Sequence, residues 1–134
     1  MTISFTPALG EIVRIPVTAD AVSVRLRFTA VLLVRDYRYY ERNGAKLQIW
    51  SDIPTINEMD GWKAFDFEDP KDGEELEQDY DQVILPFAVN APVKPGTKFF
   101  SFTYRILYPT GKVHWLGVPD RNGAFIVRRQ KMRE

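Results

Sequence analysis

The 134-residue sequence predicts an all-β fold, a mostly antiparallel β-sandwich of seven to nine short strands. Apolar and polar residues alternate in nearly every apolar segment, which is the period of a half-buried strand. Turn-forming residues (Gly, Pro, Asn and Asp) separate these segments at intervals of roughly 8 to 15 residues. No segment shows a sustained helical period. We therefore expect one core and a single domain over residues 1–134.

The chain begins with two predicted strands. Residues 12–17 form an edge strand, because Pro16 cannot donate a hydrogen bond to a ladder. In residues 22–29, valine, leucine and phenylalanine alternate with serine, arginine and threonine, as expected for a strand with one buried face. Residues 31–34 break this alternation, either as a bulge or as a strand covered on both faces.

The Asn43-Gly44 pair is the strongest hairpin signal in the sequence. It predicts a type I′ turn that joins a strand-like region at residues 31–40 to a strand at residues 46–50. Residues 53–60 contain a proline and several polar residues, which indicates a loop. The next strand is expected at residues 61–67.

An acidic stretch divides the two halves of the sequence. Residues 69–81 are rich in carboxylates and contain Asp-Pro and Asp-Gly pairs, so we expect a long exposed loop. One helical turn is allowed at residues 74–78. Residues 82–90 alternate again and predict a strand.

Aromatic residues dominate the last predicted strands. Residues 98–108 carry five aromatic or branched apolar side chains on one face, which predicts a central strand. A turn at residues 109–111 leads into a strand at 112–116, and a turn at 121–123 leads into a strand at 124–129. We expect these three strands to form a meander.

Charge and composition exclude several classes of function. Lysine plus arginine and aspartate plus glutamate both number 18, so no net positive field attracts nucleic acid. The chain has no cysteine, which suits a reducing compartment and favours the cytoplasm. No apolar run reaches the roughly 20 residues that cross a bilayer. The basic residues 128–134 are expected to be a disordered tail or the start of a linker.

The sequence offers few catalytic groups. His114 is the single histidine, so a histidine triad or a histidine metal cluster is excluded. The carboxylates at positions 66, 68, 69 and 72 are the remaining candidates for acid-base work, and solvated surface is the favoured interpretation of them. We expect no catalytic residue, no metal and no cofactor.

Aromatic side chains near predicted turns are the more informative feature. Trp50, Trp62 and Trp115 each lie near a strand end, and Tyr39 belongs to an aromatic group before Asn43. An exposed indole can stack on the apolar face of a sugar ring. Core packing is the favoured interpretation of Trp50 and Trp62, and packing or an interface is the default for Tyr39. For Trp115, core packing and ligand stacking have equal weight.

A family resemblance supports the sugar-binding interpretation. The segment FSFTYRILYPTGKVHWLGVPDRNGAFIV, from Phe100 to Val127, resembles the closing strands of starch- and glycogen-binding β-sandwich modules of carbohydrate-binding module family 21. In those modules an aromatic strand leads to a tryptophan and an asparagine-bearing loop. Their Trp-Asp-Asn-Asn run is replaced here, since Leu-Gly-Val follows Trp115 and the polar residues Asp120 and Asn122 come later.

The resemblance implies an immunoglobulin-like fold and a non-catalytic role. It implies that Trp115 stacks on sugar while Asp120 and Asn122 bond to its hydroxyls, with Trp50 or Trp62 forming a second site. The leading hypothesis is a module that binds an α-glucan-like polysaccharide or oligosaccharide, as an accessory domain beside a catalytic domain or protein partner. A protein-interaction sandwich without glycan affinity is the alternative, and a small enzyme ranks third. Neither nucleic acid nor a membrane is an expected partner.

Overall fold

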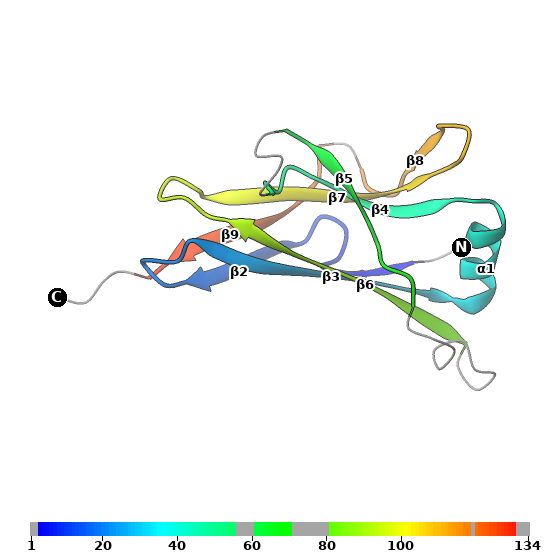
Figure 1. Ribbon diagram of the computed structural model, residues 1–134, viewed down its shortest axis with the longest axis horizontal. Coiled ribbons are helices and arrows are strands. Elements are labelled where there is room, and N and C mark those ends of the chain that lie inside the picture. Colours follow the sequence, from blue (N-terminus) through cyan, green and yellow to red (C-terminus); the bar gives the residue numbers. More distant parts are fainter. Residues whose placement is uncertain (1–2, 56–60, 71–80, 119, 131–134) are drawn as a thin grey trace.

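The protein is a β-sandwich in the computed structural model, which describes residues 3–55, 61–70, 81–118 and 120–130 (Figure 1). In this described part of the chain, nine strands form two packed sheets, and the single helix lies at one end of the sandwich. The elements are β1 (Ser4–Thr6), β2 (Ile12–Val17), β3 (Ser23–Leu33), α1 (Val34–Arg42), β4 (Lys46–Ser51), β5 (Lys63–Asp66), β6 (Gln82–Pro92), β7 (Phe99–Leu107), β8 (Val113–Trp115) and β9 (Gly123–Arg129).

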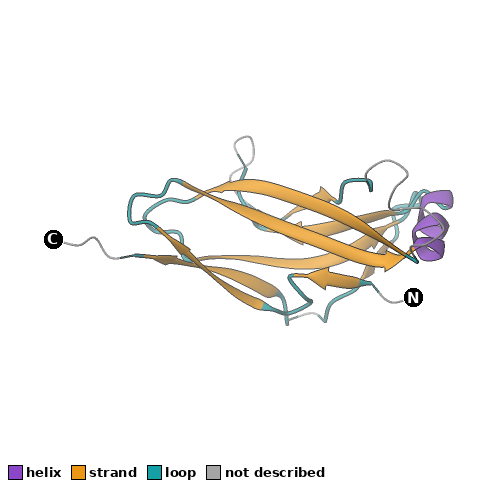
Figure 2. Ribbon diagram, turned by 90° about the horizontal axis from the view of Figure 1, so that it is seen from below, coloured by secondary structure: helices purple, strands orange, loops and turns teal. Residues whose placement is uncertain are grey.

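The two sheets differ in size. The smaller sheet has the order β1-β3-β6, and the larger has the order β2-β9-β7-β4-β5, with β8 also paired to β7. All pairings are antiparallel except that of β2 with β9, which is parallel. Figure 2 shows the long strands running nearly the full length of the molecule, with α1 at the end away from the C-terminus. The predicted all-β sandwich is confirmed.

Aromatic rings join the two sheets. Phe28 on β3 meets the edges of Phe102, Tyr104 and Phe125 on the opposite sheet, with ring centroids 5.7, 6.3 and 5.4 Å away. Phe5 on β1 stacks on Tyr104 with centroids 3.8 Å apart. Edge-to-face pairs of this kind add about 0.5–1.5 kcal/mol each beyond the burial of their area. The core is therefore centred on β3 and β7.

Several predicted strands are confirmed. In β7, residues Phe100, Phe102, Tyr104 and Ile106 are all buried, as the alternation predicts. Strand β2 is an edge strand, as Pro16 indicates, because it pairs with β9 alone. Strand β3 covers the predicted segment but starts after Val22.

The break in alternation after residue 30 is not a bulge. The pairing of β3 with β6 continues without interruption to the end of β3. Leu32 is buried in the core, while Val31 and Leu33 are half-buried on the other face. Of the two alternatives, the strand covered on both faces is the one observed.

The predicted type I′ hairpin at Asn43-Gly44 is wrong, because residues 34–42 form the helix α1 and not a strand. Asn43 has a φ of −90°, and only Gly44 takes a positive φ, of 67°. The two residues end the helix: Asn43 Nδ2 donates to the Tyr39 carbonyl at 2.7 Å and Gly44 N donates to the Glu41 carbonyl at 3.1 Å. A glycine that follows an asparagine serves a helix C-terminus as well as a hairpin.

The predicted terminal meander is also wrong in its pairing. Strands β8 and β9 do not pair with each other, since both pair with β7. β4 pairs with residues 102–107 of β7 along one side, which leaves β9 and β8 to occupy the other side in succession. The loop between β8 and β9 therefore runs along the sheet and does not form a tight hairpin.

Parts of the remaining predictions fall outside the described residues. The acidic loop 69–81 is described only at its ends, and the proposed helical turn at 74–78 lies outside the description. The same holds for residues 56–60 of the predicted loop and for 131–134 of the basic tail. Arg128 and Arg129 belong to β9, so the tail does not begin at 128. No helix in the described part of the chain is long and apolar enough to cross a membrane.

Candidate functional site

The register of the larger sheet brings aromatic and polar side chains together on its outer face. Ile49 of β4 pairs with Tyr104 of β7, and both side chains are buried in the core. Side chains alternate along a strand, so the next pair, Trp50 and Thr103, faces away from the core. This outer face carries the candidate site.

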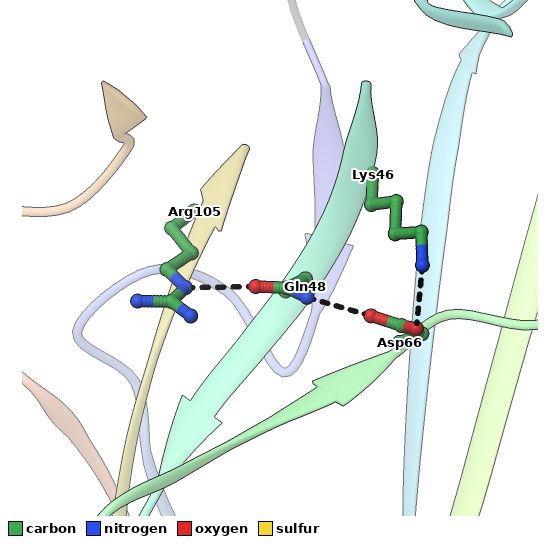
Figure 3. Close-up of polar contacts among 4 residues, drawn as sticks. All are labelled: Lys46, Gln48, Asp66 and Arg105. Atoms are coloured by element: carbon green, nitrogen blue, oxygen red, sulfur yellow. Dashed lines mark hydrogen bonds and ion pairs between the residues drawn. The ribbon is translucent and has the colours of Figure 1, made fainter. Parts of the chain in front are cut away.

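A polar row crosses the sheet beside that pair. Asp66 on β5, Gln48 on β4 and Arg105 on β7 are successive register partners, and Trp115 on β8 pairs with Arg105. Figure 3 shows the contacts: Arg105 Nε donates to Gln48 Oε1 at 2.8 Å, and Gln48 Nε2 donates to Asp66 Oδ1 at 2.7 Å. Lys46 Nζ lies 3.8 Å from Asp66 Oδ2. The row fixes the Arg105 side chain against the sheet.

Arg105 lies against two of the indoles. Its guanidinium carbon lies 4.3 Å from the ring centroid of Trp50 and 5.3 Å from that of Trp115. Burial lowers the pKa of Arg105 from its ordinary value, and the nearby charge of Asp66 opposes that change. The cation stays charged at physiological pH, because the arginine guanidinium is not deprotonated in proteins. Cation–π attraction thus holds the two rings in place.

Trp62 joins the cluster from the loop before β5. It lies two residues before Ala64, the partner of Trp50, and its ring centroid is 6.4 Å from that of Trp50 with an interplanar angle of 26°. Lys63 Nζ pins this segment by donating to the carbonyls of Ile53 and Gly61 at 2.9 and 3.1 Å. The ring centroids of Trp50 and Trp115 are 6.0 Å apart, and the two ring planes make an angle of 72°.

The three tryptophans line one open hollow of about 500 Å³, together with Thr103, Asp120 and Asn122, and its rim is completed by Gly117 and Val118. A volume of this size falls in the range of small-molecule sites. Five of the six residues predicted to bind ligand therefore meet in one place: Trp50, Trp62, Trp115, Asp120 and Asn122. The expected second site around Trp50 or Trp62 is part of the same hollow.

Exposure decides between packing and an open site for these rings. Trp115 is 47% exposed and Trp62 is 40% exposed, so neither is a core residue. Trp50 is half-buried beneath Arg105 and Trp62. Two faces are thus available to a ligand, and the third ring supports them.

The loop after β8 supplies the polar side of the hollow. A Cβ on Gly117 would lie 2.5 Å from Thr103 Oγ1, so only glycine lets the loop pass so close to β7. Asp120 has a φ of 71°, which aspartate tolerates better than most residues, and Arg121 N donates to the Val118 carbonyl at 3.1 Å. Within the described residues, no hydrogen bond uses the side chains of Asp120 or Asn122, which leaves them free to meet a ligand.

Tyr39 is the one predicted site residue that lies elsewhere. It sits on α1, is 44% exposed, and lines a second hollow of about 880 Å³. Trp115 and His114 border this second hollow too. Tyr39 is therefore separated from Trp50 and Trp62 but shares Trp115 with them.

Three of the acidic candidates for catalysis, Asp66, Glu68 and Asp69, line a hollow of about 610 Å³ near α1. Asp66 is engaged with Gln48 and Lys46, while Glu68 and Asp69 are exposed. Asp72 lies outside the described residues. No group of three or more histidine or acidic side chains in the described part of the chain could hold a metal ion.

A tyrosine beside this acidic hollow has a perturbed pKa. Burial raises the pKa of Tyr37 to about 12, and the carboxylates of Asp69 and Glu41 add to the shift. Such a phenol keeps its proton at neutral pH and cannot act as a base there. Tyr37 is therefore not a candidate base in this hollow.

Sequence analysis missed Thr103, Arg105, Gly117 and Val118 as site residues. The alternation of residues 98–108 already places Thr103 and Arg105 on the polar face of their strand. The sequence does not show which strands neighbour β7. That order is needed to find the site, because the tryptophans come from β4, β8 and the segment before β5. Gly117 carried no signal, since its need for a small residue depends on the approach of β7.

Comparison with known proteins adds no relative to these observations. None of the known family models matches the chain, and none of the curated proteins matches it significantly. The fold and the site together define an all-β sandwich domain with an aromatic hollow on one sheet face.

Proposed function

We propose that this domain is a non-catalytic module that binds an α-glucan-like polysaccharide through the tryptophan hollow. The observation that carries the proposal is the convergence of three indoles with the polar side chains of Asp120 and Asn122 in one open hollow, where neither polar side chain makes a hydrogen bond to another described residue. We further propose that it serves as an accessory domain beside a catalytic domain or protein partner in the cytoplasm.

The chemistry of a sugar matches the two sides of the hollow. A pyranose ring has apolar C–H faces that stack on the exposed indoles of Trp62 and Trp115. Its equatorial hydroxyls would reach the carboxylate of Asp120, the amide of Asn122 and the hydroxyl of Thr103, which together offer donors and acceptors. Few rotatable bonds are lost when an indole binds, which favours affinity.

The angles between the rings favour a single curved chain. Trp62 is tilted by 26° and Trp115 by 72° relative to Trp50, so the three rings share no plane. A flat crystalline surface such as that of cellulose could contact only one of the two exposed rings at a time. A chain that turns from one residue to the next, as an α-glucan does, can follow both Trp62 and Trp115, with Trp50 beneath them.

Binding to a panel of glycans tests the proposal directly. Affinity electrophoresis with soluble starch, glycogen and xylan, and pull-down with crystalline cellulose, would be followed by calorimetry on the glycans that retain the protein. We expect retention by starch and glycogen and little by cellulose. Absence of retention by every glycan would contradict the proposal.

Removing one indole tests whether Trp115 serves ligand binding or core packing. We predict that Trp115→Ala abolishes glycan retention while lowering the free energy of unfolding by less than about 1 kcal/mol, because the ring is half exposed. Loss of a core aromatic would cost about 3–5 kcal/mol instead. Phe99→Ala is the matched control, since this ring is 58% exposed on β7 and does not line the hollow.

A protein-interaction domain is the second candidate function. Val118 borders the hollow with 62% of its surface exposed, and tryptophan and arginine dominate the hot spots of protein interfaces. If no glycan is retained while Trp115→Ala stays folded, the hollow is better explained as a docking surface for a protein.

A further inference from the structure

Two hollows meet at Trp115. This indole lines the tryptophan hollow and also the second hollow, which Tyr39, Tyr108, Lys112 and His114 border. Trp115 is 47% exposed and is a shared lining residue of both. The two hollows are therefore neighbours on the surface.

We propose that the two hollows form one continuous groove for a linear glucan chain, in which Tyr39 and Tyr108 make an extension subsite. The chain would enter at Asp120 and Asn122, pass the indoles, cross Trp115 and continue toward α1. This inference rests on the proposed glycan binding and adds that the ligand is an internal stretch of a polymer, not a short oligosaccharide.

The second hollow is built from rigid parts. The β7–β8 turn is closed by bonds from Tyr108 N to the Lys112 carbonyl and from Gly111 N to the Tyr108 carbonyl, each at 2.9 Å. The end of α1 packs against this turn, since a Cβ on Gly44 would lie 2.9 Å from Pro109 Cγ. Tyr39 is thereby held at a set position relative to Trp115, as a subsite for a stiff ligand requires.

The lining of the second hollow has the same chemistry as the first. Tyr39 is 44% exposed and offers an aromatic face. Thr110, Lys112 and His114 contribute polar groups around the aromatic surface, and Val113 and Pro109 contribute apolar ones. Aromatic faces with polar neighbours suit sugar rings on both sides of Trp115.

Continuity is the reason to place a glucan there. A chain longer than the tryptophan hollow must leave it, and the side that Trp115 borders opens onto a surface that can continue the same contacts. A short oligosaccharide fills the first hollow only. Affinity should therefore increase with chain length until both hollows are occupied.

Calorimetry with linear α-1,4-linked glucose oligomers, from three to about ten units, tests this inference. We expect the affinity of the unmodified protein to rise with length. Tyr39→Ala should remove the rise, on the order of two- to tenfold, and leave the affinity for the shortest oligomers unchanged. Arg38→Ala, a change at the exposed neighbouring position on α1 outside both hollows, is the matched control and should keep the rise.

The outcomes separate this inference from the proposed function. If short oligomers bind but affinity does not grow with length, or if Tyr39→Ala weakens all lengths equally, the groove is wrong while glycan binding stands. If no oligomer and no starch binds, both fail. A thermal melt of Tyr39→Ala verifies that the variant is folded. If its melting temperature shifts as little as that of Arg38→Ala, the lost gain in affinity is assigned to the subsite and not to unfolding.

Discussion

Arg105 connects the framework of the sheet to the indoles. Its Nε is held by Gln48, and its guanidinium faces the rings of Trp50 and Trp115. It does not line the hollow, so we regard it as a positioning residue. It keeps the ring planes of Trp50 and Trp115 at an angle of 72°.

Replacing Arg105 should make the orientation of the Trp50 and Trp115 rings less fixed, while both rings stay in the protein. We predict that Arg105→Met lowers the free energy of unfolding by about 1–3 kcal/mol, because the buried Gln48 loses its donor and two cation–π contacts disappear. Tryptophan fluorescence should change in intensity and wavelength, and glycan affinity should fall. Arg105→Lys should restore part of the signal.

The matched control is an arginine on the other sheet. Arg25→Met removes an exposed side chain that bonds Asn90 at 3.2 Å, far from any tryptophan contact described above. It should leave the fluorescence spectrum unchanged. A spectrum that changes equally in both variants would show that Arg105 does not set the geometry of the rings.

At the scale of elements, the loop between β8 and β9 shapes the hollow. This loop runs along β7 because both flanking strands pair with β7, and Gly117 is its closest approach to that strand. Leu116 N donates to the Tyr104 carbonyl at 3.1 Å, which extends the contact by one residue beyond β8. Asp120 and Asn122 take their positions from this path.

A methyl group on Gly117 should therefore displace the polar side of the site. We predict that Gly117→Ala lowers the free energy of unfolding by about 1–3 kcal/mol through overpacking against Thr103 and weakens glycan binding. Gly96→Ala is the matched control, because no atom lies within 4 Å of a Cβ at that position. Chemical denaturation and calorimetry of both variants check this, and equal behaviour of the two would refute the role of the close approach.

At the scale of the whole molecule, Tyr104 joins the sheets. Its ring lies between Phe5 and Phe28, and its hydroxyl donates to the Pro7 carbonyl at 2.6 Å. Burial raises the pKa of Tyr104 far above its ordinary value of 10.0, with a smaller contribution from Glu11.

The raised pKa predicts loss of stability in alkali. A group whose pKa is higher in the folded state stabilises the fold fully below its unfolded pKa and loses that contribution as the pH rises above it. The free energy of unfolding should be steady up to about pH 10 and then fall by up to about 1.4 kcal/mol per pH unit for this tyrosine. Denaturant titrations between pH 8 and about pH 11 measure this dependence.

Tyr104→Phe isolates the contribution of this hydroxyl. We expect the variant to lose about 1–3 kcal/mol at neutral pH, because the buried Pro7 carbonyl loses its donor, and to show a shallower alkaline decline. Tyr39→Phe, a change in an exposed ring, should follow the unmodified protein at every pH. An unchanged alkaline slope in Tyr104→Phe would assign the decline to other groups.

The sandwich class, the central strand β7 and the aromatic character of the candidate site could be predicted from local sequence patterns. Alternation along a strand is local, so Phe100, Phe102 and Tyr104 could be placed on the buried face without knowledge of any partner. The position of the three tryptophans near predicted strand ends singled them out as candidates. Asp120 and Asn122 were added by the resemblance to glycan-binding modules, because asparagine and aspartate are common at any surface turn.

Which of these residues meet depends on the tertiary structure, and the two predictions of strand pairing, the Asn43-Gly44 hairpin and the terminal meander, failed for that reason. Pairing partners of a strand depend on contacts distant in sequence, so the order β9-β7-β4-β5 and the convergence of Trp50, Trp62 and Trp115 could not be derived from local patterns. The apolar positions of α1 fit a helix that packs on the end of the sandwich, and the Asn-Gly pair that follows ends a helix as well as it turns a hairpin. Gly117 matters because it approaches Thr103, and Arg105 matters because it contacts Trp50 and Trp115. These neighbours are distant in the sequence, so local patterns could not reveal them.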